Sequence, residues 1–291
     1  MNLANDTVTL LSALTDASSL FIAAAGLTLV FGAMRIINIA HGSFYMYGAF
    51  LVAALAGTST GARLWLALLA APLIVAAIGG AVEVTVLRRI YKREHLVQLV
   101  ATYALFLIFA DLALRFWGSS PHAVSTPQLL GGTAHIGSRE FPVYDLFSIG
   151  IAVAVGLGLW LLLQRTPLGW RIRAAVEDPE TLAAGGTNVP ILFTTVFTIG
   201  ALLAGVAGAL AAPLESIVPG LDASIIVTAF IVAVIGGLGS ITGAALGAVL
   251  ISLFNAAGVL WLPSWEPAFV YLAMIIVLAI RPWGLLGTPE R

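Results

Sequence analysis

Long apolar runs without charge alternate with short polar segments along almost the whole chain. A charge at the bilayer centre costs about 3 kcal/mol, and about 20 apolar residues are enough for a helix to cross the hydrocarbon core. The charge-free runs cover residues 17–34, 42–62, 64–82, 95–110 with an extension towards Trp117, 146–164, 181–214, 223–265 and 267–280. We expect the run 223–265 to hold two helices, separated at 236–243. The pattern predicts an all-α, polytopic transmembrane helix bundle with about eight spans.

The composition argues against a soluble fold. Hydrophobic residues make up 60% of the 291 residues and charged residues only 9%, whereas soluble domains carry about 25% charged residues. So few charges do not cover a water-exposed surface, but a surface that faces membrane lipid does not need them. The net charge of −1 gives no electrostatic basis for binding nucleic acid. We therefore expect a single transmembrane domain over 1–291 that is embedded in membrane lipid and does not bind nucleic acid.

Basic residues indicate how the chain is oriented in the membrane. Two clusters follow the third and the fifth apolar run, and they contain Arg88, Arg89, Lys92 and Arg93 in the first and Arg165, Arg171 and Arg173 in the second. Short loops rich in lysine and arginine stay on the cytoplasmic side. The clusters predict a cytoplasmic face for both loops, an N-terminus outside and a cytoplasmic C-terminus.

The segment 36–43, between the first two runs, places polar residues at membrane depth. Asn38, His41 and Ser43 are costly in lipid, so we expect them to face a cavity or a protein neighbour. A plain interfacial turn with Gly42 as its hinge is one interpretation. The functional interpretation is a broken or re-entrant helix that lines a substrate pathway, because irregular backbone is tolerated where it lines a cavity. These four residues are the predicted pathway residues.

We expect no enzyme chemistry from this chain. A Walker A motif needs a lysine after a glycine-rich loop, but the single lysine, Lys92, follows Tyr91. A hydrolytic pair of His41 and Ser43 is disfavoured, because residues two apart on a helix point to different faces. The chain also has no cysteine, which excludes thiol chemistry. We therefore predict no catalytic residue, no metal site and no cofactor on this chain.

The second basic loop, 165–190, is predicted to be structured. Asp178 is a favourable N-cap, and Pro179 suits the first position of a helix. A pair of glycines after residue 184 provides a helix end. The segment therefore predicts a short helix over 179–184, parallel to the membrane between two spans.

Several separated segments resemble one protein family. They read GLTLVFGAMRIINIAHGSFYMYGAF at 26–50, RTPLGWRIRAAVEDPETLAAGGTNV at 165–189 and, towards the C-terminus, FTIGALLAGVAGALAAP, AVIGGLGSITGAALGA and RPWGLLG. In this order they resemble the LivH-type permeases, which are membrane subunits of the ABC importers for branched-chain amino acids. The resemblance extends over nearly the whole chain.

The resemblance implies a division of labour between subunits. It implies an importer in the bacterial inner membrane with a second, LivM-like permease subunit, two ATPase subunits that bind the ATP, and an extracytoplasmic solute-binding protein. The solute would be a branched-chain amino acid or a related amino acid, amide, urea or aromatic acid. A secondary carrier or channel that is independent of ATP is the alternative.

The resemblance also assigns the loop 165–190 to coupling. The helix over 179–184 would dock on an ATPase subunit, flanked by charged residues and anchored by arginines. The residues expected in this role are Arg171, Arg173, Glu177, Asp178, Pro179, Glu180, Gly185 and Gly186.

Overall fold

Helices dominate the computed structural model, which describes residues 3–91, 93–136, 139–261 and 266–287. The long helices are α1 (Leu3–Met34), α3 (Ala62–Thr85), α4 (His95–Trp117), α5 (Val143–Arg165), α8 (Val189–Ala211) and α10 (Ile241–Trp261). Shorter apolar helices are α2 (His41–Ala56), α9 (Leu221–Gly236) and α11 (Glu266–Ile280). The other elements are the helices α6 (Pro167–Glu177) and α7 (Pro179–Ala184), the 3-10 turns η1 (Leu87–Arg89) and η2 (Gln128–Leu130), and an antiparallel hairpin of β1 (Thr133–Ile136) and β2 (Arg139–Pro142).

Within the described residues, six helices are long and apolar enough to cross a membrane. By contrast, α2 and α9 have 16 residues each and α11 has 15. At about 1.5 Å per residue, 16 residues extend about 24 Å, which is less than the ~30 Å of the hydrocarbon core. The predicted all-α membrane bundle is confirmed, whereas the count of about eight spans is not.

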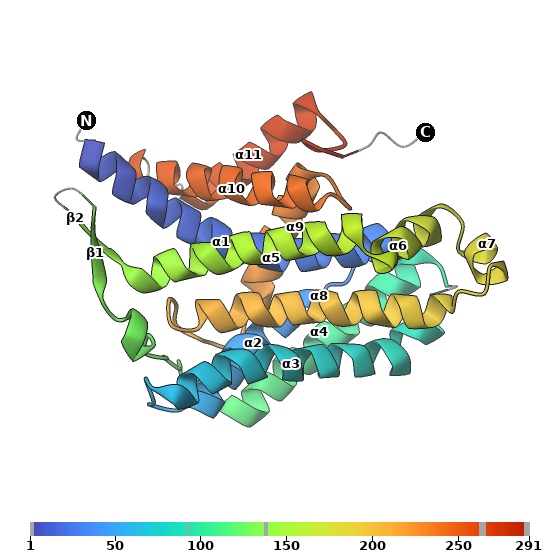
Figure 1. Cartoon of the computed structure of the whole chain (residues 1–291), viewed down its shortest axis with the longest axis horizontal. Helices are drawn as coiled ribbons and strands as arrows, with labels where there is room; N and C mark the ends of the chain where they lie inside the picture. Colours follow the sequence, from blue (N-terminus) through green and yellow to red (C-terminus); the bar gives the residue numbers. More distant parts are fainter. Residues whose placement is uncertain (1–2, 92, 137–138, 262–265, 288–291) are drawn as a thin grey trace.

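The first and last described segments lie at opposite ends of the bundle. α1 begins at the end that carries β1 and β2, and the C-terminal turn lies towards the end that carries α6 and α7 (Figure 1). The amides of Leu285 and Leu286 hold this turn by donating to the carbonyl oxygens of Ile235 and Gly236. A chain whose ends lie on opposite sides of a membrane crosses it an odd number of times. A count of eight is thus incompatible with the predicted orientation of the two termini.

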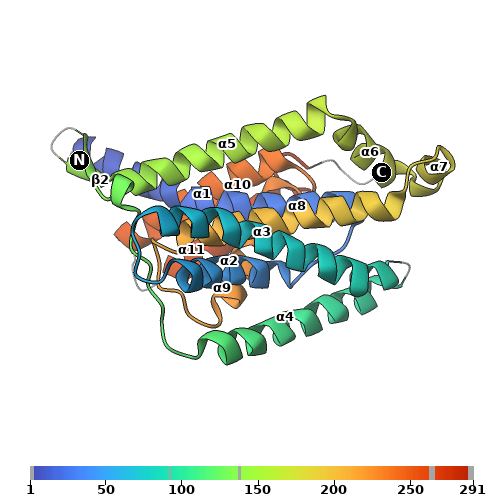
Figure 2. The same ribbon diagram turned by 60° about the horizontal axis from the view of Figure 1, so that its bottom comes forward.

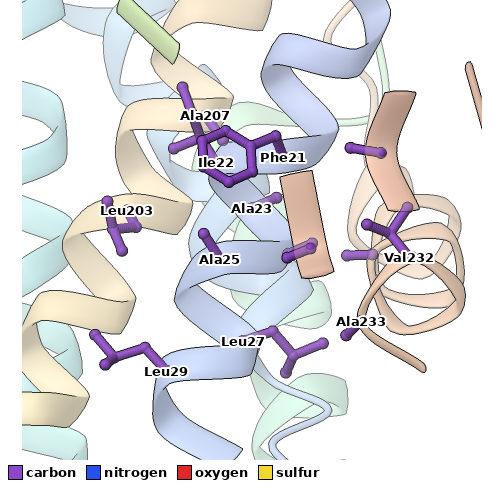
Figure 3. Packing of buried hydrophobic residues seen from close by; sticks show 14 of the residues in the cluster. Phe21, Ile22, Ala23, Ala25, Leu27, Leu29, Leu203, Ala207, Val232 and Ala233 are labelled. Atoms are coloured by element: carbon purple, nitrogen blue, oxygen red, sulfur yellow. The ribbon is translucent and has the colours of Figure 1, made fainter. Parts of the chain in front are cut away.

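α1 and α8 form the centre of the bundle. α1 packs against α5, α8, α9 and α10, while α8 also packs against α2 and α3. Figure 3 shows Ile22 of α1 between Leu203 of α8 and Val232 of α9. Gly208 of α8 lies so close to α2 that an added Cβ would be 1.9 Å from the carbonyl oxygen of Tyr45. Small residues thus bring the helix backbones into direct contact, as is usual where lipid supplies no hydrophobic driving force.

Both predicted helix breaks are present. α9 ends and α10 begins across residues 237–240, inside the predicted 236–243. Residues 35–40 separate α1 from α2, and Arg35 has a φ of 54°, the one positive φ among the described residues other than glycine. This left-handed backbone is unfavourable for a residue with a side chain. The break turns α2 into the bundle, where most of its residues are buried.

An ion pair between α3 and η1 and a hydrogen bond to α8 join these three elements near one end of the bundle. Glu83 of α3 is fully buried, and an Arg88 guanidinium nitrogen lies 3.3 Å from its carboxylate. The Tyr91 hydroxyl donates to the same carboxylate, and Arg88 donates to the Thr194 hydroxyl of α8. These bonds fix the turn after α3 against the start of α8.

Candidate functional site

The first turns of α2 and α9 meet inside the bundle. The Ser43 hydroxyl donates to Asp222 Oδ2 over 3.2 Å, and both residues are fully buried. Gly42 permits this contact, because an added Cβ would lie 2.4 Å from the Asp222 carbonyl oxygen. We refer to Asn38, His41, Gly42, Ser43 and Asp222 as the polar junction.

Two side chains of the polar junction have polar atoms without a hydrogen-bond partner among the described residues. His41 Nε2 donates to the Ala23 carbonyl oxygen over 2.9 Å, which leaves Nδ1 as an acceptor with no donor among the described residues. The two amide atoms of Asn38 also have no partner within the described part of the chain. Each residue is 1% exposed, and an unpaired buried polar group costs about 1–3 kcal/mol. Such a cost is typical of positions that serve a functional contact.

The fold brings the four predicted pathway residues together. Asn38 precedes α2, and His41, Gly42 and Ser43 form its first turn. All four are buried, and their contact with a solute stays a prediction. His41 and Ser43 bond to separate partners, so the two do not form the Ser–His pair of a hydrolase.

Two acids of this region, the buried Asp222 and the exposed Glu215, are absent from the sequence prediction. Asp222 directly precedes the apolar run 223–265. In the sequence it therefore resembles a charged residue at the end of a membrane span. Its burial depends on Ser43, which is 179 positions away. Glu215 accepts a hydrogen bond of 2.7 Å from the Tyr45 hydroxyl across 170 positions. The sequence signal for either residue is only an acid next to an apolar segment.

The loop 165–190 carries the second group of predicted site residues. Its helix α7 coincides with the predicted helix over 179–184. Asp178 caps α7 by accepting hydrogen bonds of 3.0 Å from the amides of Glu180 and Thr181. The local sequence therefore determines both ends of this element.

The helix α6, which the sequence analysis does not predict, connects the loop to the bundle. It buries Ile172 and Ala175 and contacts α1, α5 and α8. Both Arg171 and Arg173 are exposed, and Arg173 donates to the Leu163 carbonyl oxygen near the end of α5 over 2.7 Å. The position of Arg173 fits the expected anchoring of the loop.

The other predicted coupling residues lie on the exposed side of the loop. They are Glu177, Asp178, Pro179, Glu180, Gly185 and Gly186. Gly186 has a φ of 86°, which glycine adopts at little cost. Figure 2 shows α7 projecting beyond the ends of α5 and α8. The fold thus presents a capped helix at a place that a partner protein can reach.

Replacing Asp178 with alanine is expected to open the first turn of α7, whereas asparagine should preserve it. The Thr181 hydroxyl and amide, with the Glu180 amide, stabilise the ionised carboxylate and lower the pKa of Asp178. Because this pKa is lower in the folded state, the cap is complete at neutral pH and is lost as the pH falls through the lowered pKa. Hydrogen exchange of the Glu180 and Thr181 amides at neutral pH measures the effect, and equal protection in the two variants would contradict the cap.

The fold and the polar junction define a multi-pass membrane protein with polar groups inside an apolar bundle, which is the general design of a permease. The chain belongs to the family described as branched-chain amino acid transport system / permease component, whose sequence model matches residues 9–278. This is a transport family and not a family of enzymes.

Curated relatives match over nearly the same length. The chain is 32% identical over 295 residues to the high-affinity branched-chain amino acid transport system permease protein BraD of Pseudomonas aeruginosa, across 97% of this chain and 95% of the relative. It is 28% identical over 293 residues to the LivH permease of Escherichia coli, across 95% and 94%. The fructose import permease FrcC of Rhizobium meliloti is 32% identical over 189 residues, across 61% of this chain and 51% of the relative. No solved structure matches the chain significantly, but these relatives confirm the resemblance to LivH-type permeases.

Proposed function

We propose that the chain is the membrane-spanning subunit of an ABC importer in the bacterial inner membrane. It would move a branched-chain amino acid, or a related small solute, with energy from ATP that partner subunits bind and hydrolyse. The observation that carries this proposal is the capped helix α7, which projects from the bundle of a chain that belongs to a permease family. The partners would be a second permease subunit, two ATPase subunits and an extracytoplasmic binding protein.

The packing of the loop supports a mechanical role. α7 contacts α6 and α8, and α6 contacts α1, α5 and α8. α8 in turn packs along α1, α2 and α3 through the centre of the bundle. A displacement of α7 by an ATPase would therefore reach the polar junction through packed helices, as in other rigid-body transitions. This arrangement would place α6, α7 and the C-terminus in the cytoplasm and the N-terminus outside.

The solute is inferred from the relatives. BraD and LivH are named for branched-chain amino acids and match almost the whole chain, whereas FrcC is named for fructose and matches 61% of it. The length of the match favours a branched-chain amino acid. If the solute is not a branched-chain amino acid, it would be a related amino acid, an amide, urea or an aromatic acid.

Copurification tests the coupling role of α7. We expect a tagged chain, expressed with the neighbouring genes of its operon, to retain ATPase subunits. Simultaneous glycine substitutions at Glu177, Asp178 and Pro179 should reduce this retention about tenfold or more, because they remove charged contacts, the cap and the rigid first position of the helix.

The matched control places glycine at Glu140 and Pro142 of β2, at the opposite end of the bundle, and should leave the ATPase bound. A chain that transports solute in proteoliposomes with no ATPase present would overturn the proposal. That result would favour a secondary carrier or channel.

A further inference from the structure

We propose that a cavity between α1, α9, α10 and α11 binds the ammonium group of the solute through the carboxylate of Asp16. This inference rests on the proposed function as an amino acid importer. The cavity has a volume of about 220 Å³, which is below the ~300–1,000 Å³ of sites for drug-sized ligands. Its polar lining consists of Asp16, Thr228, Ser252, Asn255 and Tyr271.

Asp16 is an acid within the long apolar helix α1, directly before its charge-free run 17–34. The apolar span of α1 begins at Thr7, so Asp16 lies about 13 Å further along the helix axis at 1.5 Å per residue. Its side chain is exposed at the surface of the chain, and it forms no ion pair among the described residues. A carboxylate on an apolar helix is costly where it faces lipid and is stable where it faces water, a cation or a protein neighbour.

Ser252 supplies a second and independent indication of a ligand. It lines the cavity and is 2% exposed, yet its hydroxyl oxygen has no hydrogen-bond partner in the described part of the chain. Buried hydroxyl groups normally have a partner. A solute that reaches this cavity would provide one.

The remaining lining residues suit the other end of an amino acid. Leu20, Ile231, Ile251 and Val270 form the apolar part of the lining, which favours a branched aliphatic side chain. No lysine or arginine belongs to the described lining, so the one formal charge among these lining residues is that of Asp16. The cavity therefore favours an ammonium group over a free carboxylate, and the Asn255 amide and Tyr271 hydroxyl are donors available to the carboxylate of a zwitterion.

A single introduced thiol tests this site, because the chain has no cysteine of its own. The experiment uses the complex of this chain with its permease and ATPase partners, without the solute-binding protein. With Thr228→Cys in this complex, at a lining position that has no role in the proposed binding, we expect L-leucine to slow labelling by a thiol reagent about tenfold, and the leucine analogue without its amino group to have no effect. Adding Asp16→Asn should abolish the protection, as expected when a charge-assisted hydrogen bond is lost. Adding Asp16→Glu should retain it.

Two controls accompany the test. Asp111→Asn removes another exposed carboxylate of a spanning helix, outside the cavity, and should leave the protection unchanged. A thiol at Thr58, in the exposed turn between α2 and α3, should be labelled at the same rate with or without L-leucine.

Equal protection by the deaminated analogue, protection that survives Asp16→Asn, or no protection by L-leucine would each overturn the inference. If the ATPase subunits still copurify in those cases, the proposed importer function stands. Loss of the ATPase from the unmodified chain would instead contradict the proposed function itself.

Discussion

Replacing Gly42 with alanine should lower the free energy of unfolding by about 3 kcal/mol or more and abolish transport. The added Cβ would lie 2.4 Å from the Asp222 carbonyl oxygen and 2.8 Å from Ile226 Cβ. The first of these atoms belongs to the backbone of α9 and does not move aside by a change of rotamer, so α2 and α9 would have to separate. Overpacking of a core typically costs about 1–3 kcal/mol, and separation would also break the bond between Ser43 and Asp222. The midpoint of thermal unfolding in detergent and solute uptake measure the two effects.

Gly158 of α5 provides the matched control. An added Cβ there would meet no atom within 4 Å, and the residue is exposed on its helix. Gly158→Ala should therefore leave stability unchanged or raise it slightly, since alanine is the better helix former. If Gly42→Ala unfolds at the same temperature as Gly158→Ala, that result contradicts the close packing of α2 against α9.

The second large effect is expected for Arg88→Ala. Among the described residues, the substitution leaves the fully buried Glu83 carboxylate with Tyr91 as its remaining hydrogen-bond donor. Removing one partner of a buried ion pair costs about 3–5 kcal/mol, because the other charge stays buried without compensation. The Arg88 side chain is 34% exposed, so water screens the pair in part and we expect about 3 kcal/mol. Thermal unfolding of the purified chain measures the loss.

A double variant separates charge from packing. Glu83→Gln together with Arg88→Met removes both charges and retains most of the volume and the contact with Tyr91. It should be clearly more stable than Arg88→Ala alone, since replacing both members of a buried pair is often nearly neutral. If the double variant is as unstable as the single one, the uncompensated charge of Glu83 is not the cause.

Local signals in the sequence predict much of this structure. The cap at Asp178, the proline after it and the paired glycines suffice to define α7 to the residue. The glycines around 236–243 suffice to place the break between α9 and α10. These features depend on neighbours within a few positions, and such neighbours are visible in one sequence.

Features that depend on distant contacts are not predictable in this way. Asp222 is buried because Ser43 approaches it from 179 positions away. The cavity beside Asp16 forms from four helices that meet only in the fold. The count of about eight spans is not confirmed, because apolar runs alone do not distinguish a full crossing from the shorter α2, α9 and α11. The helix α6 is missed because its contacts with α1, α5 and α8 are tertiary.

The meeting of α2 and α9 has a consequence for the response to membrane voltage. The N-terminus of a helix carries about half a positive charge, and two such ends converge where Ser43 contacts Asp222. The negative charge of an ionised Asp222 would cancel these two partial positive charges, so that the net charge there is about zero. Moving one elementary charge through 100 mV changes the free energy by about 2.3 kcal/mol. A joint shift of both helix ends and this carboxylate would move almost no net charge across the membrane. The conformational step of transport should then proceed at nearly the same rate in energised and in depolarised membranes.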